Sequence, residues 1–354
     1  MTKHLLKKVV ISLVGGVLIA LTCSIFTTAT ARTSFYYEVT DLGTHEGQSS
    51  AAYGINNVGL VVGSWYTSNN FKRAFLWRDG TMLDLGTFGG KYDTIADDIN
   101  NAGQVIGHSD TNTNSGSRAF KWQNGTMTKL DPLVGDDYSR AYGINRRGQV
   151  VGSSSAINEL SHAVLWEKGT TTNLGTLGGN SSFAYDINNI GQIIGYSYTT
   201  NQSLHAFLWE KGTMIDLGTL GGNSSQALGI NNLGKAIGRA DTSSGFYHGF
   251  LWENDTMTDL GTLGGNYSIA NGINDVGKVV GDSFTAISGN GSPHAFLWEN
   301  GRMRDLNNLL PNNSGWELVS ACDINNKGQI VGYGRFNNSQ GYKAFLLTPV
   351  RVSN

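Results

Sequence analysis

The sequence predicts an all-β fold, a seven-bladed β-propeller with four antiparallel strands in each blade. A block of about 44 residues recurs seven times, and a period of that size is typical of propellers and solenoids. Each block contains short apolar segments separated by Gly and Asn, without the longer apolar periodicity of a helix. The isoleucine of a repeated Ile-Asn pair marks the seven copies: Ile55, Ile99, Ile144, Ile187, Ile230, Ile273 and Ile324.

Four strands can be followed in one copy, residues 184–222. The first reads AYDIN and ends in an N-N-x-G turn, the second reads GQIIG, the third HAFLW and the fourth TMIDLGT. In three copies the third and fourth strands are joined by Asp79-Gly80, Asn124-Gly125 or Asn300-Gly301, dipeptides that favour a two-residue type I′ hairpin. The second and third strands are almost continuously apolar, which suits sheets buried on both faces by neighbouring blades.

The strand count also predicts how the ring closes. A complete third and fourth strand follow the first pair six times, whereas the seventh copy ends at Leu346-Leu347 without a fourth strand. The segment Tyr37–Gly43, YEVTDLG, has the sequence of the missing strand. We therefore expect the N-terminal strand to complete the last blade, so that no terminal repeat needs a cap.

Residues 1–31 are expected to be a signal peptide, and residues 32–354 a single propeller. Lys3, Lys7 and Lys8 precede an apolar run, and Ala29-Thr30-Ala31 matches a cleavage site. An uncleaved anchor is the alternative. Removal of this segment leaves 22 basic and 27 acidic residues, a formal charge of −5, which gives no basic patch for nucleic acid. Cys322 is then the only cysteine, so no internal disulfide is expected.

The repeated sequences LWExGTMxDLGTLGG and GINNxGQVVG, with His-Ala-Phe at His205 and His294, resemble the HAF family of extracellular repeat proteins. The resemblance extends over residues 36–347 and implies secretion and a repeat fold. It implies no biochemical activity and no catalytic residues. Three copies carry Arg73, Arg118 or Lys343 in the histidine position.

Aromatic residues in the longer links are the first candidates for ligand binding. In a four-stranded blade the tight turns share one rim and the longer, variable links share the other, and variable loops on a constant scaffold commonly bind ligands. Aromatic rings among Asn, Ser and Thr suit sugar rings, whereas packing within their own loops is the alternative. The candidates are Trp65, Tyr66, Phe246, Tyr247 and Trp316.

A cationic position at the start of the third strand is the second candidate, and we call it the cation slot. It could hold an anionic ligand, or each cation could pair with a carboxylate diagonally across its own hairpin. Its residues are Arg73, Arg118, His162, His205, His248, His294 and Lys343. The opposing acids are Asp84, Asp216, Asp259, Asp305 and Asp41.

Neither a metal site nor a cofactor is expected, because no HExxH or CxxC motif occurs and the histidines lie on different blades. Four acids of the innermost strands could face the central channel and supply the carboxylate pair of a glycoside hydrolase: Asp97, Asp98, Asp186 and Asp323. Neither a Ser-His-Asp order nor an activated cysteine is visible.

The favoured hypothesis is an exported, extracellular or periplasmic, monomeric and non-catalytic binding module. Its expected partner is a glycan or another surface molecule, without binding to nucleic acid and without a membrane anchor after cleavage. A structural or adhesive envelope protein and a polysaccharide hydrolase are the two alternatives.

Overall fold

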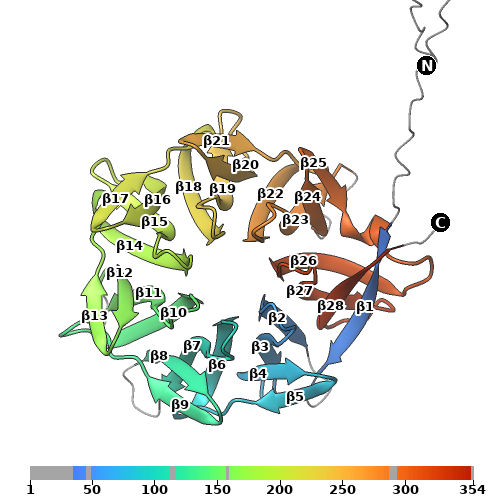
Figure 1. The fold of residues 1–354 in the computed structure, drawn as a ribbon, viewed down its shortest axis with the longest axis horizontal. Coiled ribbons are helices and arrows are strands. Elements are labelled where there is room, and N and C mark those ends of the chain that lie inside the picture. The colour runs from blue at the N-terminus through green and yellow to red at the C-terminus, as the bar shows by residue number, and fades with distance from the viewer. Residues whose placement is uncertain (1–34, 45–48, 112–115, 157–158, 287–292, 352–354) are drawn as a thin grey trace, which may run out of the picture.

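The computed structural model describes residues 35–44, 49–111, 116–156, 159–286 and 293–351. Seven four-stranded antiparallel sheets form a ring around a central channel (Figure 1), which confirms the predicted seven-bladed propeller. The expected signal peptide, residues 1–31, lies outside the described residues.

The four strands of each blade are described in order from the central channel to the outer surface. The innermost strands are β2 (Ser50–Ile55), β6 (Gly89–Ile99), β10 (Tyr138–Ile144), β14 (Gly178–Ile187), β18 (Gly221–Ile230), β22 (Gly264–Ile273) and β26 (Trp316–Ile324). The second strands are β3 (Val61–Tyr66), β7 (Val105–Thr111), β11 (Val150–Ser155), β15 (Ile193–Thr199), β19 (Ala236–Thr242), β23 (Val279–Thr285) and β27 (Ile330–Phe336).

The outer half of each blade consists of the third and fourth strands, which a hairpin joins in the first six blades. The third strands are β4 (Lys72–Arg78), β8 (Ser117–Gln123), β12 (His162–Glu167), β16 (Leu204–Glu210), β20 (Tyr247–Glu253), β24 (His294–Glu299) and β28 (Lys343–Arg351). The outermost strands are β5 (Thr81–Asp84), β9 (Thr126–Lys129), β13 (Thr170–Asn173), β17 (Thr213–Asp216), β21 (Thr256–Asp259), β25 (Arg302–Asp305) and β1 (Phe35–Gly43). A short 3-10 helix, η1 (Leu306–Leu309), precedes β26.

The chain closes the ring as predicted. β1 pairs antiparallel with β28, with Phe35 opposite Arg351, and the last sheet has the order β1-β28-β27-β26. Tyr37 of β1 is fully buried in the core shared by β24, β26 and β28. The last blade therefore contains both ends of the described chain, as Figure 1 shows on its right side.

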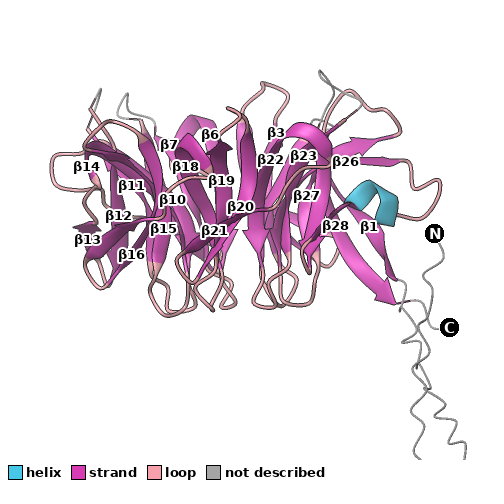
Figure 2. Cartoon of the chain, turned by 90° about the horizontal axis from the view of Figure 1, so that it is seen from above, coloured by secondary structure: helices cyan, strands magenta, loops and turns pink. Residues whose placement is uncertain are grey.

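The tight turns gather on one rim and the longer links on the other (Figure 2). In the hairpin between β4 and β5 the two central residues, Asp79 and Gly80, have φ angles of 48° and 83°, as a type I′ turn requires. The same conformation occurs at Lys168-Gly169, Lys211-Gly212 and Asn254-Asp255, where the sequence signal was weaker.

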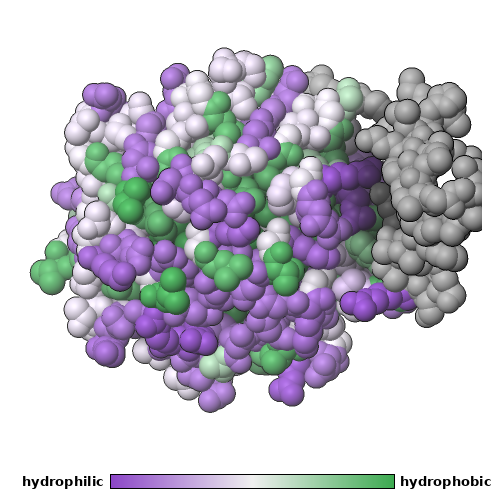
Figure 3. Space-filling view, turned by 45° about the horizontal axis from the view of Figure 1, so that its top comes forward, coloured by the Kyte–Doolittle hydropathy of each residue, from purple (hydrophilic) through white to green (hydrophobic). Residues whose placement is uncertain are grey.

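The hydrophobic core lies between the blades. Val62 and Ala74 of the first blade, for example, pack against Ala96 and Phe120 of the second. The outer surface has no comparable cluster in the view of Figure 3, where hydrophobic side chains form separate spots among hydrophilic ones. Four of the most exposed aliphatic side chains occupy the turn after the repeated isoleucine, which reads N-N-x-G in three of these blades and N-D-x-G in the sixth: Val58, Ile190, Leu233 and Val276.

A ring of asparagines joins all seven blades, and we call it the asparagine ring. Each member follows the repeated isoleucine, is buried, and donates from its side-chain amide to the backbone carbonyl of its counterpart in the next blade at 3.0–3.1 Å. The same side chain accepts hydrogen bonds from its own turn, as Asn188 does from the N–H groups of Ile190 and Gln192. The members are Asn56, Asn100, Asn145, Asn188, Asn231, Asn274 and Asn325.

We predict that Gly238→Ala disrupts the fifth blade, whereas Gly249→Ala in the same blade is tolerated. A Cβ atom at Gly238 would lie 1.9 Å from the backbone oxygen of Gln226, so the pairing of β18 with β19 would have to shift. At Gly249 the nearest atom would be 3.3 Å away, and six other blades carry Ala there. Thermal unfolding should show a large loss for the first variant and a change within about 1 kcal/mol for the second. Equal losses would contradict this view.

We predict that Asn188→Asp destabilises the fold by at least about 2 kcal/mol, because the buried amide donors to Asn231 and Gln192 are lost and a charge is buried. Asn189→Asp is the matched control. Its side chain only accepts, from the N–H of Arg146, and Asp275 performs that role in the sixth blade. Chemical denaturation should separate the two variants, and a similar loss in both would argue against the asparagine ring.

Candidate functional site

The channel wall is built by a β-bulge in every innermost strand. In each of them the pairing with the second strand shifts by one residue just before the repeated isoleucine, as between Ala184 and Asp186 in β14. A bulge re-aims a side chain, and here two consecutive residues line the channel, such as Tyr185 with Asp186 or Cys322 with Asp323. The channel therefore displays two rings of side chains at this depth.

The first ring contains only Asp and Gly, and its aspartates connect neighbouring blades. Asp186 accepts hydrogen bonds from the N–H of Ile187 in its own strand (2.7 Å) and of Ile230 in the next blade (2.9 Å). Asp98 and Asp323 make the equivalent bonds to Ile144 and Ile55. The other four blades have glycine at this position: Gly54, Gly143, Gly229 and Gly272.

Burial controls the protonation of these three carboxyl groups. It raises the pKa of Asp98 to about 6 and the pKa values of Asp186 and Asp323 to about 7. Repulsion from Asp98 adds to the raised pKa of the other two, while the backbone N–H donors oppose it. The predicted position of these acids in the channel is confirmed, and their hydrogen bonds give each of them a structural role.

The second ring varies between blades, with tyrosine in three of them and four other residue types in the rest. Positions that pack between blades repeat, as Ala52 and Ile55 do, so the variable ring is not dictated by packing. The ring consists of Tyr53, Asp97, Tyr142, Tyr185, Leu228, Asn271 and Cys322. Burial raises the pKa of the Cys322 thiol to about 12, which keeps it protonated at neutral pH.

One side of the channel carries a continuous group of half-buried aromatic rings from the third and fourth blades, which we call the aromatic wall. The rings of Tyr142 and Tyr185 lie 5.1 Å apart, those of Tyr185 and Tyr196 5.7 Å, and Phe183 stacks on Tyr196 at 4.9 Å. Other blades place polar pairs at the same level, such as His108 with Asp97 (3.1 Å) and Asn271 with Asp282 (3.0 Å). The channel lining is therefore aromatic on one side and polar on another.

A cavity of about 200 Å³ adjoins the aromatic wall between the third and fourth blades. It lies towards the rim of the longer links, since it includes residues at the start of β10 and at the end of β11. Its lining contains one cation, four serines and three aromatic rings: Tyr138, Ser139, Arg140, Tyr142, Ser153, Ser155, Ser161 and Phe183. We call it the Arg140 pocket.

The structure does not place the predicted aromatics in one site. Trp65, predicted as a ligand-binding residue of the longer links, belongs instead to β3 and points into the core, where its ring is 2% exposed and packs near Phe75. Trp316 is half-buried against Phe336 and Phe345.

The remaining predicted aromatics pack against nearby side chains. Phe246 and Tyr247 both contact the ring of Tyr267, at 5.3 and 4.6 Å. Tyr66, which is 36% exposed, lies under the Lys72 ammonium group. These residues therefore form local contacts rather than a shared sugar platform, and the partner of Phe246 and Tyr247 belongs to β22 of the next blade rather than to their own loop.

The cation slot lies on the third strands, two strands outward from the channel. The diagonal pairing predicted for it is confirmed in four blades: His205 with Asp216 (2.7 Å), His248 with Asp259 (2.8 Å), His294 with Asp305 (2.7 Å) and Lys343 with Asp41 (3.0 Å). The fifth predicted pair, Arg73 with Asp84, is not among the ion pairs of the described residues. The other slot residues, Arg118 and His162, sit at the start of β8 and β12.

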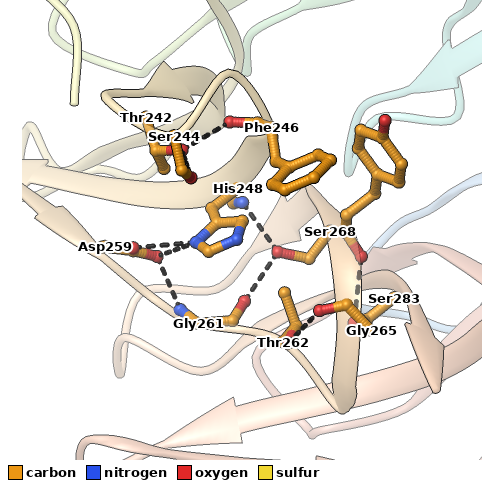
Figure 4. Close-up of polar contacts among 12 residues, drawn as sticks. Thr242, Ser244, Phe246, His248, Asp259, Gly261, Thr262, Gly265, Ser268 and Ser283 are labelled. Atoms are coloured by element: carbon orange, nitrogen blue, oxygen red, sulfur yellow. Dashed lines mark hydrogen bonds and ion pairs between the residues drawn. The ribbon is translucent and has the colours of Figure 1, made fainter. Parts of the chain in front are cut away.

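Figure 4 shows this arrangement where the fifth blade meets the sixth. His248 points to Asp259, whose carboxylate also accepts from the N–H of Gly261. Ser268 of the next blade accepts from the N–H of Gly249 and donates to the carbonyl of Gly261. The slot therefore belongs to a repeated joint between blades.

In the part of the chain that the structure describes, no group of three or more His, Cys, Asp or Glu side chains is arranged to hold a metal ion. Within the same ranges no helix has the length and apolar character needed to span a membrane.

No protein-family model and no curated protein matches this chain. The β-propeller domain of the Trilobed protease from Pyrococcus furiosus is similar in structure, with a TM-score of 0.54 at 9% identity over 90% of this chain and 98% of that one. That propeller has an open velcro topology, whereas β1 closes the ring here.

A puromycin-hydrolyzing peptidase from Mycobacterium tuberculosis gives a TM-score of 0.50 at 11% identity over 84% of this chain. This chain spans about half of that peptidase, 49% of its length. Such low identities establish a shared fold and nothing about activity.

We predict that the three channel aspartates make the fold less stable as the pH rises. Each folded pKa lies above the unfolded value of about 3.9, so between about pH 4 and 7 the unfolded chain loses protons that the folded chain keeps. The free energy of unfolding therefore falls with rising pH in this window.

The matched variant is Asp98→Gly, Asp186→Gly, Asp323→Gly, because four blades already carry Gly there. Melting temperatures measured from pH 5 to 8 should decrease more steeply for the parent protein than for this variant. Parallel curves would show that the three carboxyl groups ionise alike in the folded and unfolded chain.

Proposed function

We propose that this protein is a non-catalytic binding module that binds a glycan at the mouth of the channel, next to the aromatic wall. The observation that carries the proposal is the concentration of blade-specific residues there, on a scaffold whose packing positions repeat. Side chains that the scaffold does not require are the ones available for recognition. The propeller fold is compatible with a binding function, and also with a hydrolytic one.

The chemistry of the Arg140 pocket supports a sugar ligand. The rings of Tyr142 and Phe183 offer apolar faces, and the hydroxyl groups of Ser153, Ser155 and Ser161 offer donors and acceptors on the same cavity. Its volume of about 200 Å³ is below the roughly 300–1,000 Å³ of pockets for drug-sized ligands. One sugar unit of a longer chain would enter, while the rest would lie along the channel mouth.

An extracellular or cell-surface glycan fits the expected export of the chain and its resemblance to the HAF repeat proteins. A structural or adhesive envelope role is the alternative if the channel mouth binds no sugar.

A polysaccharide hydrolase is the second candidate function, supported by one observation. The pKa values of Asp186 and Asp323, about 7, are in the range that a general acid needs at neutral pH. Loss of turnover in Asp186→Asn with unchanged glycan binding would favour hydrolysis.

We predict that the double variant Phe183→Ala, Tyr196→Ser weakens glycan binding by about tenfold or more, as the loss of a buried aromatic contact commonly does. These two residues face each other across β14 and β15, and the first blade carries Ala51 and Ser64 at the same positions, so the scaffold accommodates the pair. The measurement is binding to a glycan array, followed by calorimetry with the best ligand.

Tyr92→Ala is the control, since Tyr92 is 55% exposed and packs on Phe71 away from the channel wall. Binding that survives in the double variant would move the site away from the aromatic wall. An array without any bound glycan would refute the glycan proposal and favour the envelope role.

A further inference from the structure

We infer that the ligand carries an anionic substituent, a carboxylate or a sulfate on a sugar ring, and that Arg140 binds it in the Arg140 pocket. This inference rests on the proposed function and narrows it from any glycan to an acidic one.

Arg140 is the only charged residue at its position in the repeat. Its counterparts in the other blades are Ala51, Ile95, Phe183, Gln226, Ile269 and Ser320. A packing requirement would repeat from blade to blade, as Ala52 and Ile55 do, so the scaffold does not explain an arginine here.

The Arg140 side chain is exposed at the cavity. Within the part of the chain that the structure describes, its guanidinium group takes part in no hydrogen bond and no ion pair, and it acts on Tyr142 and Tyr185 only through its charge. No carboxylate lines the cavity. The acids nearest along the chain are Asp136, which accepts from the Ser154 hydroxyl, and Asp137, whose N–H donates to Ser155.

Arg239, on the other side of the aromatic wall, differs in this respect. It donates to the side chain of Gln226 at 3.1 Å and stacks on Tyr247 at 5.2 Å. Both arginines act electrostatically on Tyr185, where each of them lowers a pKa that burial raises overall to a value above the ordinary range. The aromatic wall therefore lies between two positive charges, of which only Arg140 presents a vacant set of donors.

The position of Arg140 suits an anion attached to a sugar ring. A guanidinium group offers a planar fork of N–H donors that matches carboxylate and sulfonate-type oxygens with two parallel hydrogen bonds. Arg140 pairs with Ser153 across β10 and β11, and Tyr138 pairs with Ser155, so hydroxyl groups flank the fork. Phe183 from the next blade completes the lining of the cavity. An anion on the fork would thus place its sugar ring against the aromatic side chain.

The experiment compares three sugars, glucose, glucuronate and glucose 6-sulfate, by calorimetry or by NMR titration of the purified protein. Arg140→Gln is the test variant, because the fifth blade carries Gln226 at the same position. Arg239→Gln is the control, since it removes the same charge from the opposite flank. Melting temperatures verify that both variants are folded.

We expect one or both acidic sugars to bind at least about tenfold more tightly than glucose, and this preference to disappear in Arg140→Gln but persist in Arg239→Gln. Which acidic sugar gives the preference then distinguishes carboxylate from sulfate. Equal loss in both variants would show a general effect of positive charge and would overturn the assignment to Arg140.

Equal affinity of all three sugars, unchanged in Arg140→Gln, would overturn the inference while leaving the proposed glycan function intact. Absence of binding by any of the three, together with an empty glycan array, would overturn both.

Discussion

The structure depends on the asparagine ring, a closed circle of seven hydrogen bonds. Each of its seven side chains donates to the next blade in the same direction around the ring. One side chain performs two tasks, because its oxygen shapes the tight turn of its own blade while its amide fixes the distance to the neighbour. Turn geometry and blade spacing are thereby set by the same residue. Since the circle must return to Asn56 after seven steps, the blade number and the local turn are linked.

Around this fixed circle the other positions divide into two groups. Packing residues between the blades repeat, whereas the bulged residues on the channel are free to differ, and this freedom produces an aromatic side and a polar side in one scaffold. In the first ring of the channel, Asp and Gly alternate from blade to blade, and each aspartate accepts a hydrogen bond from the blade that follows. Because the number of blades is odd, this alternation cannot be complete, and two glycines, Gly229 and Gly272, lie in successive blades.

Much of the fold could be predicted from the sequence, because its determinants are local and repeated. The period, the Asx-Gly hairpins and the strand-like segment Tyr37–Gly43 each indicate the architecture without long-range information. The candidate site could be predicted less well. Trp65 and Tyr66 are adjacent in the sequence, yet one is buried and the other exposed, because the buried part of β3 ends at Trp65. The aromatic wall depends on the bulge before Asp186, and no residue type in the sequence marks a bulge that re-aims a neighbour. Arg140 lies in a regular pair with Ser153, before the bulge of its strand, and its departure from the repeat was a usable signal in the sequence.

The closure of the last blade also determines the order in which the fold can form. β1 is synthesised first, but its partner β28 comes last, with Phe35 paired to Arg351. Until then β1 is an unpaired edge, and the first six blades form an open arc beside an incomplete seventh blade. Contacts between such distant residues are slow to form and leave apolar surface exposed in the meantime. Completion of the ring is therefore a late event. A chain arrested before β28 would leave β1 without its partner strand and would leave apolar surface uncovered at both ends of the arc.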